Sequence, residues 1–196
     1  AKAMHAPIDL HIHTTASDGS MSPAEVVTAG QSLGLGAVGI ADHDTVDGVA
    51  EALETGARVG MEVAPGVELS TDLRKKTVHV LGYFFDHRHP FLLEKLEWAK
   101  GVRAQRNHKI VARFNEMGID LTYDEVQAKA GGDVVGRPHF ARALKEKGVV
   151  ATVQEAFDVY LGYGGKAYVS KFRFTPAQSM ELILKAGGLP VLAHPG

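Results

Sequence analysis

The chain has 196 residues, of which 45% are hydrophobic and 22% charged, as expected of one globular domain or of one domain with an insertion. The net charge of −2 argues against a broad nucleic-acid-binding surface, and the lack of cysteine excludes disulfides, thiolate zinc sites and a cysteine nucleophile. No apolar run approaches the ~20 residues that span a bilayer, and no secretory signal precedes the first predicted strand, so we expect a cytoplasmic protein. The sequence does not indicate the oligomeric state.

The first predicted strand and the turn after it carry candidate metal ligands. Residues Ile8–Ile12 alternate apolar and polar side chains, the period of two that is typical of a strand with unlike faces. His11 and His13 therefore share a face, and Asp18 follows in the turn. Imidazoles and carboxylates are suitable ligands for divalent metals. A lone His-x-His pair is more often an ordinary exposed strand face, so this prediction depends on the rest of the chain.

A strand–helix pattern continues after this turn. Ser22-Pro23-Ala24-Glu25 is a capping box with proline at the first helical position, and it predicts a helix that ends near Gly34. Ala37–Ala41 is a short apolar run typical of a buried parallel strand. It leads into Asp42-His43-Asp44-Thr45, which places His43 in a polar cluster at the carboxyl end of that strand.

The next elements place two further polar side chains in apolar surroundings. Asp47–Gly60 is predicted as a helix, and Glu62–Ser70 and Thr77–Phe85 as strands. The strands carry Glu68 and His79 within otherwise apolar runs. A buried strand rarely tolerates an unpaired carboxylate, so Glu68 requires a cation or a metal as its partner.

The pattern then changes from strands to helices. A long helix is predicted over Pro90–Met117, and three shorter helices follow it. We expect residues 1–100 to be the first part of a barrel, 101–166 a helical insertion that forms a lid or substrate wall, and 167–196 the continuation of the barrel. In this last part Ala167–Ser170 is predicted as a strand, Thr175 begins another helix, and Leu189–Ala193 is a strand that delivers His194.

Acidic and histidine side chains at the ends of alternating strands and helices indicate an α/β barrel with its active site on the carboxyl face. Five motifs in order also resemble those of the polymerase-and-histidinol-phosphatase (PHP) family, whose members are distorted seven-stranded barrels that hydrolyse phosphoesters with up to three metal ions. The motifs are His11-Ile-His13-Thr14 with Ser17-Asp18-Gly19, Ala41-Asp42-His43-Asp44-Thr45, Pro65-Gly66-Val67-Glu68-Leu69-Ser70, Val78-His79-Val80-Leu81-Gly82-Tyr83 and Ala193-His194-Pro195-Gly196.

The resemblance implies a distorted (β/α)7 TIM-like barrel, incomplete at its carboxyl terminus, with a helical insertion. It also implies two to three divalent ions. Mn²⁺ is the expected ion, and Zn²⁺ or Fe²⁺ are alternatives. The implied ligand sets are His11, His13 and Glu68 for the first ion, Asp18 and His43 for the second, and Glu68, His79 and His194 for the third. A Glu68 that bridges two ions would hold them ~3.5–4 Å apart. The alternative for each histidine alone is a hydrogen-bonded core residue.

Substrate contacts are expected from the insertion. Arg103 and Arg106 are one turn apart on the long predicted helix, and similar proteins use an Arg-x-x-Arg near the phosphate. A solvated basic helix face is an equally good interpretation. Arg137 and His139 lie at the amino terminus of a predicted helix, where anions bind readily.

Within the family, the sequence most resembles the nucleotide-directed phosphoesterases, so the expected substrate is a 3′,5′-bisphosphonucleotide or an oligonucleotide 5′ end. In this hypothesis a hydroxide that bridges two metals attacks phosphorus, and the ions, helped by Arg106, stabilise the phosphoryl charge. His139 or a metal-bound water assists the leaving group. The implied catalytic residues are Asp18, His43, Glu68, Arg106 and His139. The alternatives are a single-metal amidohydrolase or deaminase, and a non-catalytic PHP-like structural module.

The chain departs from the family pattern in one respect. Family members carry a further strand with Asp-x-His, which completes the first two metal sites, whereas this sequence stops at Gly196. We therefore expect either a fragment of a longer protein or a missing partner segment. As the sequence stands, only the third ligand set is complete.

Overall fold

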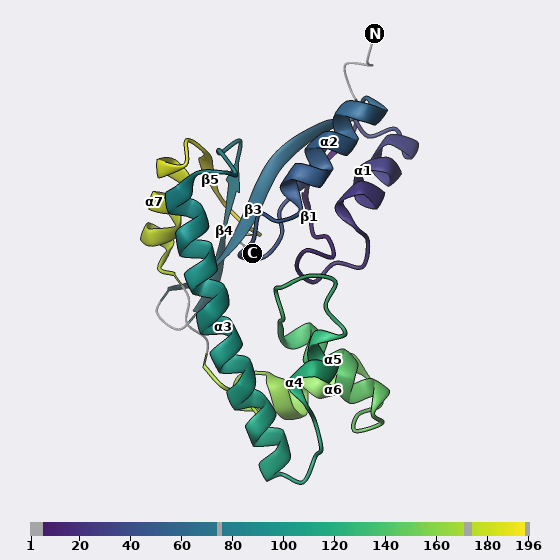
Figure 1. The fold of residues 1–196 in the computed structure, drawn as a ribbon, viewed down its shortest axis with the longest axis vertical. Coiled ribbons are helices and arrows are strands. Elements are labelled where there is room, and N and C mark those ends of the chain that lie inside the picture. Colours follow the sequence, from purple (N-terminus) through teal and green to yellow (C-terminus); the bar gives the residue numbers. More distant parts are fainter. Residues whose placement is uncertain (1–5, 74–75, 171–173, 195–196) are drawn as a thin grey trace.

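The computed structural model describes residues 6–73, 76–170 and 174–194. Within these ranges the chain forms a five-stranded mixed sheet, with a long helix that runs from the sheet to a group of shorter helices (Figure 1). Neighbouring strands of the sheet follow the chain order β1-β2-β3-β4-β5. The strands are β1 (Ile8–Ile12), β2 (Ala37–Ile40), β3 (Glu62–Leu73), β4 (Lys76–Tyr83) and β5 (Leu189–Leu192).

The first half of the sheet is parallel and is built from strand–helix units. Helix α1 (Pro23–Ser32) connects β1 to β2, and α2 (Val49–Val59) connects β2 to β3. The capping box predicted at the start of α1 is present, because Ser22 Oγ accepts the Glu25 N–H and Glu25 accepts the Ser22 N–H. The carboxyl ends of the parallel strands therefore meet at one edge.

The second half of the sheet is antiparallel, which differs from the expected alternation of strands and helices. Only positions 74 and 75 separate Leu73 of β3 from Lys76 of β4. A parallel neighbour would need a crossover of a dozen or more residues, so β4 must run antiparallel to β3. β5 in turn pairs antiparallel with β4. The predicted α/β class is confirmed, but over the described residues the sheet is open and no closed barrel is formed.

The helical segment has a hydrophobic core of its own. It contains α3 (Pro90–Glu116), α4 (Tyr123–Gln127), α5 (Arg137–Glu146), α6 (Val153–Ala156) and the π-helix η1 (Phe157–Leu161). Buried side chains between Ile110 and Ala167 pack into one cluster that includes no residue of the sheet, and we call this cluster the insertion core. Helix α3 runs without a break across the boundary predicted between residues 100 and 101. The division into barrel and insertion stays a prediction.

The strand predicted over Ala167–Ser170 is wrong. Ala167 lies in a turn, and the residues from Tyr168 to Ser170 have no regular secondary structure. Ala167 is fully buried in the insertion core, and its N–H donates to Tyr160 O, while the Tyr168 N–H donates to Gly165 O. Because these donors satisfy local turns, they are not available to a sheet partner.

The chain then returns to the sheet. Phe174 forms an isolated bridge with Thr71 of β3. Helix α7 (Pro176–Lys185) begins at the predicted Thr175 cap and packs beside α3 (Figure 1). Across the described ranges, none of the helices combines the length and the apolar character that crossing a membrane would require.

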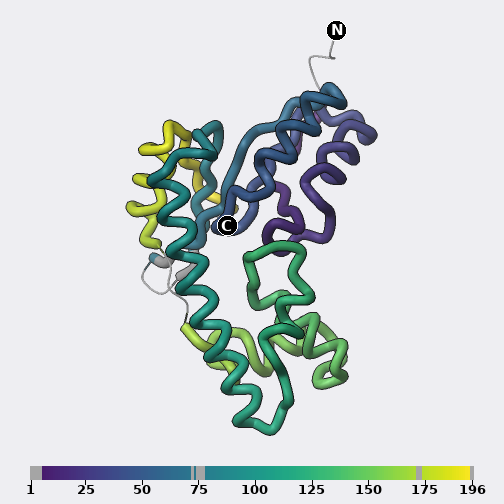
Figure 2. The backbone as a smooth tube through the Cα atoms, viewed as in Figure 1, coloured from purple at the N-terminus to yellow at the C-terminus, as the bar shows by residue number. Residues whose placement is uncertain are grey.

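The loop between α4 and α5 brings the insertion back to the sheet, as the tube in Figure 2 shows. A Cβ on Gly131 would lie 2.4 Å from Thr15 Cβ, in the turn that follows β1. This close approach requires glycine, since real Cβ contacts are essentially never so short. The insertion therefore approaches the sheet at two places, through Leu92 and Leu96 of α3, which pack with residues of β3, and through this loop.

The insertion core should contribute strongly to stability. Leu144 of α5 is fully buried in it, whereas Leu33 at the end of α1 is 77% exposed. Leu144→Ala should lower the free energy of unfolding by about 2–5 kcal/mol, because it removes buried methyl groups and leaves a cavity. The matched control Leu33→Ala should change it by less than about 0.5 kcal/mol. Urea denaturation of both variants measures the difference, and equal small losses would contradict an independent core.

Candidate metal centre

Glu68 is the centre of a ring of histidines. Its side chain is 1% exposed, and its ion-pair partners within the described ranges are all imidazoles. Oε2 lies 3.0 Å from His11 Nε2, 2.9 Å from His13 Nε2 and 3.4 Å from His43 Nδ1, and Oε1 lies 2.8 Å from His79 Nδ1 and 3.1 Å from His194 Nε2. We call these six residues the Glu68 cluster.

The pairing of the strands produces this convergence. The Glu68 N–H donates to Asp42 O, and Glu68 O accepts the Asp44 N–H, so His43 lies beside Glu68 at the end of β2. His79 faces Ser70 across the antiparallel β3–β4 pair. The Ala193 N–H then donates to His79 O, which brings the residue that follows β5 to the same edge. The five strands thus deliver their ligands to one point.

Asp18 adds a second carboxylate to one side of the cluster. Its Oδ1 lies 2.8 Å from His13 Nδ1. The turn that carries Asp18 is held by Asp42, which accepts hydrogen bonds from Thr14 N, Thr14 Oγ1 and Ser17 Oγ at 2.6–2.7 Å. Asp42 therefore fixes the backbone of the loop.

The cluster strongly shifts the pKa values of its members. Burial by itself lowers the pKa of His13, but hydrogen bonds to Asp18 and Glu68 outweigh it and raise that pKa to about 10. Burial works against the charged form of Asp18, yet the His13 contact lowers its pKa to about 2. The pKa of Glu68 is also well below its usual range, because its hydrogen bonds to the histidines outweigh burial. Burial lowers the pKa of His43 to about 4.

The donor atoms fit divalent metal ions. Three groups have ligand atoms that lie within 4.8 Å of one another, and they are His11/His13/Glu68, His13/Asp18/His43 and His43/Glu68/His79. In the described part of the chain, the buried Nδ1 atoms of His43 and His79 have no partner with hydrogen-bond geometry, although His79 Nδ1 is close to Glu68. Buried nitrogens are normally hydrogen-bonded, so a cation that accepts their lone pairs would satisfy both of them.

These groups can be compared with the predicted ligand sets. The structure brings together all seven predicted ligands, including His11, His13 and Glu68 as one set. His13 joins Asp18 and His43 in the second group, and His43 joins Glu68 and His79 in the third. His194 reaches Glu68 Oε1 but lies outside these groups. Which residue binds which ion, and how many ions bind, stay predictions.

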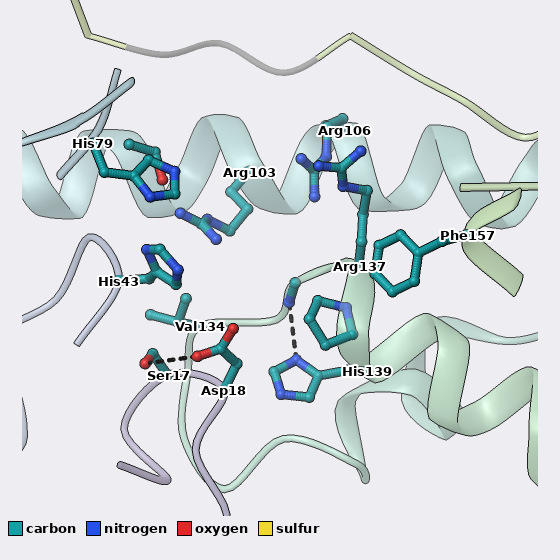
Figure 3. A pocket seen from close by; sticks show the side chains of 13 residues that line it. Ser17, Asp18, His43, His79, Arg103, Arg106, Val134, Arg137, His139 and Phe157 are labelled. Carbon is teal, nitrogen blue, oxygen red and sulfur yellow. Dashed lines mark hydrogen bonds between the residues drawn. The ribbon is translucent and has the colours of Figure 1, made fainter. Parts of the chain in front are cut away.

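A pocket opens from the cluster toward the insertion (Figure 3). We call it the arginine pocket, because Arg103, Arg106 and Arg137 all line it. Its other lining residues are Ser17, Asp18, His43, Ser70, His79, Val134, Gly136, Pro138, His139 and Phe157.

The two arginines of α3 occupy positions that should be apolar. Leu92, Leu96 and Ala99 continue in steps of three and four residues through Arg103 and Arg106 to Ile110 and Phe114, so all seven share one face of the helix. Leu92 and Leu96 pack in a second hydrophobic cluster, which contains Val67 and Leu69 of β3 and which we call the sheet core. Ile110 and Phe114 pack in the insertion core. Arg106 is only 6% exposed, so the alternative of a solvated basic face is wrong for this residue.

Each arginine is held by its surroundings. Arg103 Nη2 pairs with Asp44 Oδ2, while Asp44 Oδ1 accepts the Ser70 N–H at 2.8 Å. Arg106 Nη2 donates to Asn107 Oδ1 at 2.7 Å. Arg137 Nη1 donates to Leu161 O at 3.1 Å. The guanidinium groups are therefore largely pre-positioned at the pocket wall.

His139 is a buried residue at the first turn of α5. Its Nδ1 accepts the Gly136 N–H at 2.9 Å, so a neutral ring carries its proton on Nε2. Burial and the nearby Arg142 lower the pKa of His139. The ring is therefore neutral at pH 7, and it can offer an N–H donor from Nε2.

Several lining residues were not predicted from the sequence, namely Ser17, Ser70, Val134 and Phe157. The contact of Asp44 with Arg103 was also missed. A signal for the arginines was present, since Arg103 and Arg106 interrupt an apolar helical stripe. Phe157 has no comparable signal, because an aromatic residue after a short helix usually belongs to a core.

The sequence profile of the PHP domain matches residues 9–181, which is most of the chain. The chain belongs to the PHP-domain family. This confirms the resemblance inferred from the five motifs.

Relatives of this PHP domain cover almost the whole chain. A 5′-3′ exoribonuclease of Haemophilus influenzae is 38% identical over 95% of the chain and 68% of its own length. A 3′,5′-nucleoside bisphosphate phosphatase of Chromobacterium violaceum is 33% identical over 97% of the chain and 67% of its own length. A Bifidobacterium adolescentis structure described as a metal-dependent phosphoesterase superposes with a TM-score of 0.90 at 31% identity, over 97% of the chain and 68% of its own. The chain thus spans about two thirds of each relative.

The comparisons confirm the predicted class, a metal-dependent phosphoesterase of the PHP family. A single-metal amidohydrolase would not require the ligand groups on both sides of Glu68. A non-catalytic module is disfavoured as well, because the predicted ligands are all present and converge on one point.

Glu68 should be indispensable for metal binding. Glu68→Gln preserves shape but removes the buried charge, so metal content should fall by more than one ion per chain and hydrolysis should become undetectable. Glu62→Gln, at an exposed position of the same strand, is the matched control and should change neither. Inductively coupled plasma mass spectrometry after dialysis measures the metal content. Unchanged stoichiometry in the Glu68→Gln variant would remove Glu68 from the centre.

Metal binding should release a proton at neutral pH. The metal-free His13 ring is protonated below its pKa of about 10, and an imidazolium cannot bind a cation. Affinity for Mn²⁺ should therefore rise with pH, by about tenfold per unit between pH 7 and 9 for one displaced proton. Isothermal titration calorimetry in buffers of different ionisation enthalpy counts the released protons.

Asp18→Asn provides the control for this proton release. It removes one of the two carboxylates that raise the pKa of His13, so fewer protons should be released at pH 7.5. If the wild-type protein binds Mn²⁺ without releasing protons, His13 is already neutral and the electrostatic description of the cluster is wrong.

Proposed function

We propose that this PHP domain removes phosphate from a nucleoside 3′,5′-bisphosphate, or acts at the 5′ end of an oligoribonucleotide. The observation that carries the proposal is the direct junction of the Glu68 cluster with a pocket walled by Arg103, Arg106 and Arg137. A metal centre alone suits many hydrolases, whereas three guanidinium groups beside it favour a substrate with more than one phosphate. The names of two relatives support the same substrate classes.

The Glu68 cluster and Asp18 would hold two to three ions, with Mn²⁺ as the preferred ion and Zn²⁺ or Fe²⁺ as alternatives. Bound ions would supply Lewis acidity and an activated water. The protein residues contribute the charge and shape of the site. Glu68 and Asp18 provide the anionic ligands, and His43 stays neutral over the physiological range because burial holds its pKa at about 4.

The arginines would bind and orient the phosphates. Arg103 reaches toward the cluster and lies between it and Arg106 in the view of Figure 3, so we assign Arg103 to the phosphate that is cleaved. Arg106 and Arg137 lie farther from His43 and His79 in that view and would hold the second phosphate. Because all three guanidinium groups are already anchored, little side-chain entropy is lost on binding.

His139 would assist as a hydrogen-bond donor. Since Gly136 occupies Nδ1, only the Nε2 proton is available to substrate. A neutral imidazole is a poor acid, so we assign His139 to orienting a phosphate or leaving-group oxygen and not to protonating it. This role is one way in which His139 would assist the leaving group, as expected from the sequence.

The remaining sequence predictions extend this proposal. The helical insertion would form the wall that separates the substrate from water. The distorted (β/α)7 barrel, the cytoplasmic location and the absence of a broad nucleic-acid-binding surface remain predictions. An oligonucleotide would accordingly be held by its 5′ end and not along its length.

The function of Arg106 distinguishes a bisphosphate substrate from a generic one. In the full-length protein, Arg106→Ala should reduce kcat/KM on adenosine 3′,5′-bisphosphate by about ten- to a hundredfold, since charge-assisted hydrogen bonds contribute roughly 1.5–3 kcal/mol. The loss on p-nitrophenyl phosphate, which has no second phosphate, should be much smaller. Phosphate release measures both rates.

Lys109→Ala is the matched control, because Lys109 lies on the same helix but is exposed. It should leave both rates unchanged. Equal losses on the two substrates in the Arg106 variant would make Arg106 a general phosphate contact. No hydrolysis of any nucleoside bisphosphate or 5′-phosphorylated RNA by the metal-loaded wild-type protein would overturn the proposed function.

A further inference from the structure

The arginine pocket ends on an aromatic ring. Phe157, the first residue of η1, lines the pocket, and Figure 3 shows its ring beside Arg137 on the side away from His43 and His79. It is the one Phe, Tyr or Trp side chain among the described residues that line the pocket. The pocket thus runs from metal ligands, past guanidinium groups, to a flat apolar surface.

The backbone fixes this ring in place. The Gly162 N–H donates to Phe157 O at 2.7 Å, five residues back, which closes the wide turn of a π-helix. A Cβ on Gly162 would lie 2.6 Å from Phe157 O, so the turn depends on glycine. The Phe157 side chain is half-buried, and part of it packs against the insertion core while part of it faces the pocket. The Phe157 ring is therefore already held at the pocket wall, and its side chain would not need to become ordered when a ligand binds.

A cation lies next to the ring. The Arg137 guanidinium carbon is 5.9 Å from the Phe157 ring centroid, and Arg137 Nη1 is fixed by Leu161 O at the end of the same π-helix. An aromatic face beside an anchored arginine matches a nucleotide, in which a flat base is linked through ribose to phosphate.

We propose that Phe157 is the stacking surface for the nucleobase of the substrate. This inference rests on the proposed function and deepens it, since it assigns the far end of the pocket to the base and the guanidinium groups to the phosphates. Among the described lining residues there is no Asn or Gln, the side chains that pair with adenine, and the arginines, which can pair with guanine, are assigned above to the phosphates. Phe157 therefore selects nucleotides over simple sugar phosphates and accepts all four bases, because every base has a π-face.

The test compares a nucleotide with the same sugar phosphate without its base. The probes are adenosine 3′,5′-bisphosphate and the abasic 1-deoxyribose 3,5-bisphosphate, and binding to the full-length metal-free protein is measured by calorimetry together with kcat/KM for the metal-loaded form. Phe157→Leu keeps an apolar side chain for the core but removes the aromatic face. It should weaken binding of the nucleotide by about five- to a hundredfold and leave the abasic probe unchanged.

Two further variants keep the test decisive. Phe157→Trp retains a larger aromatic face and should restore nucleotide binding, which a merely structural role of Phe157 would not predict. Phe84→Leu, at a 59% exposed phenylalanine away from the pocket, is the matched control and should have no effect. Adenine, guanine, cytosine and uracil bisphosphates should bind the wild-type protein within about tenfold of one another.

The outcomes separate this inference from the proposed function. If the wild-type protein binds and hydrolyses both probes equally well, or Phe157→Leu weakens both equally, the base site is wrong and the phosphatase proposal stands. If neither probe is bound or hydrolysed, the proposed function itself fails.

Discussion

The burial of one carboxylate determines much of this structure. Glu68 lies in the middle of β3 with 1% of its side chain exposed, and an isolated charge there would be prohibitively costly. The sheet compensates by directing imidazoles from the other four strands toward the two oxygens of this carboxylate. The parallel half and the antiparallel half of the sheet thus meet at the Glu68 carboxylate.

The positively charged groups beside the Glu68 cluster come from outside the sheet. Helix α3 brings arginines to the cluster, and the loop near Gly131 returns to the turn after β1. The pocket is therefore bounded by α3 and by the loop that precedes α5, two segments that share one insertion core. Asp44 connects the sheet to α3, since it accepts a hydrogen bond from the Ser70 N–H of β3 and pairs with Arg103 of α3.

Candidate metal ligands that lie in or directly after a strand could be predicted from the sequence. His11, His43 and Glu68 each follow or occupy an apolar run, and parallel strands leave little choice of where such residues meet. The strand predicted over Ala167–Ser170 failed because its apolar side chains serve the insertion core, and periodicity does not distinguish the two uses. Phe157 could not be predicted as a lining residue either, since its position at the pocket depends on a π-helical turn and on tertiary packing.

The continuity of α3 constrains how this protein can vary. Leu96 is packed against the sheet core and Ile110 against the insertion core, and the arginines lie between them on the same face. One residue inserted between Leu96 and Ile110 would turn the insertion by about 100° relative to the sheet. Seven residues would nearly restore the phase, but would displace the insertion by ~10 Å along the axis. The length of α3 thus fixes both the distance and the rotation between the sheet core and the insertion core. Sequence change in this segment should therefore proceed by substitution and not by insertion or deletion.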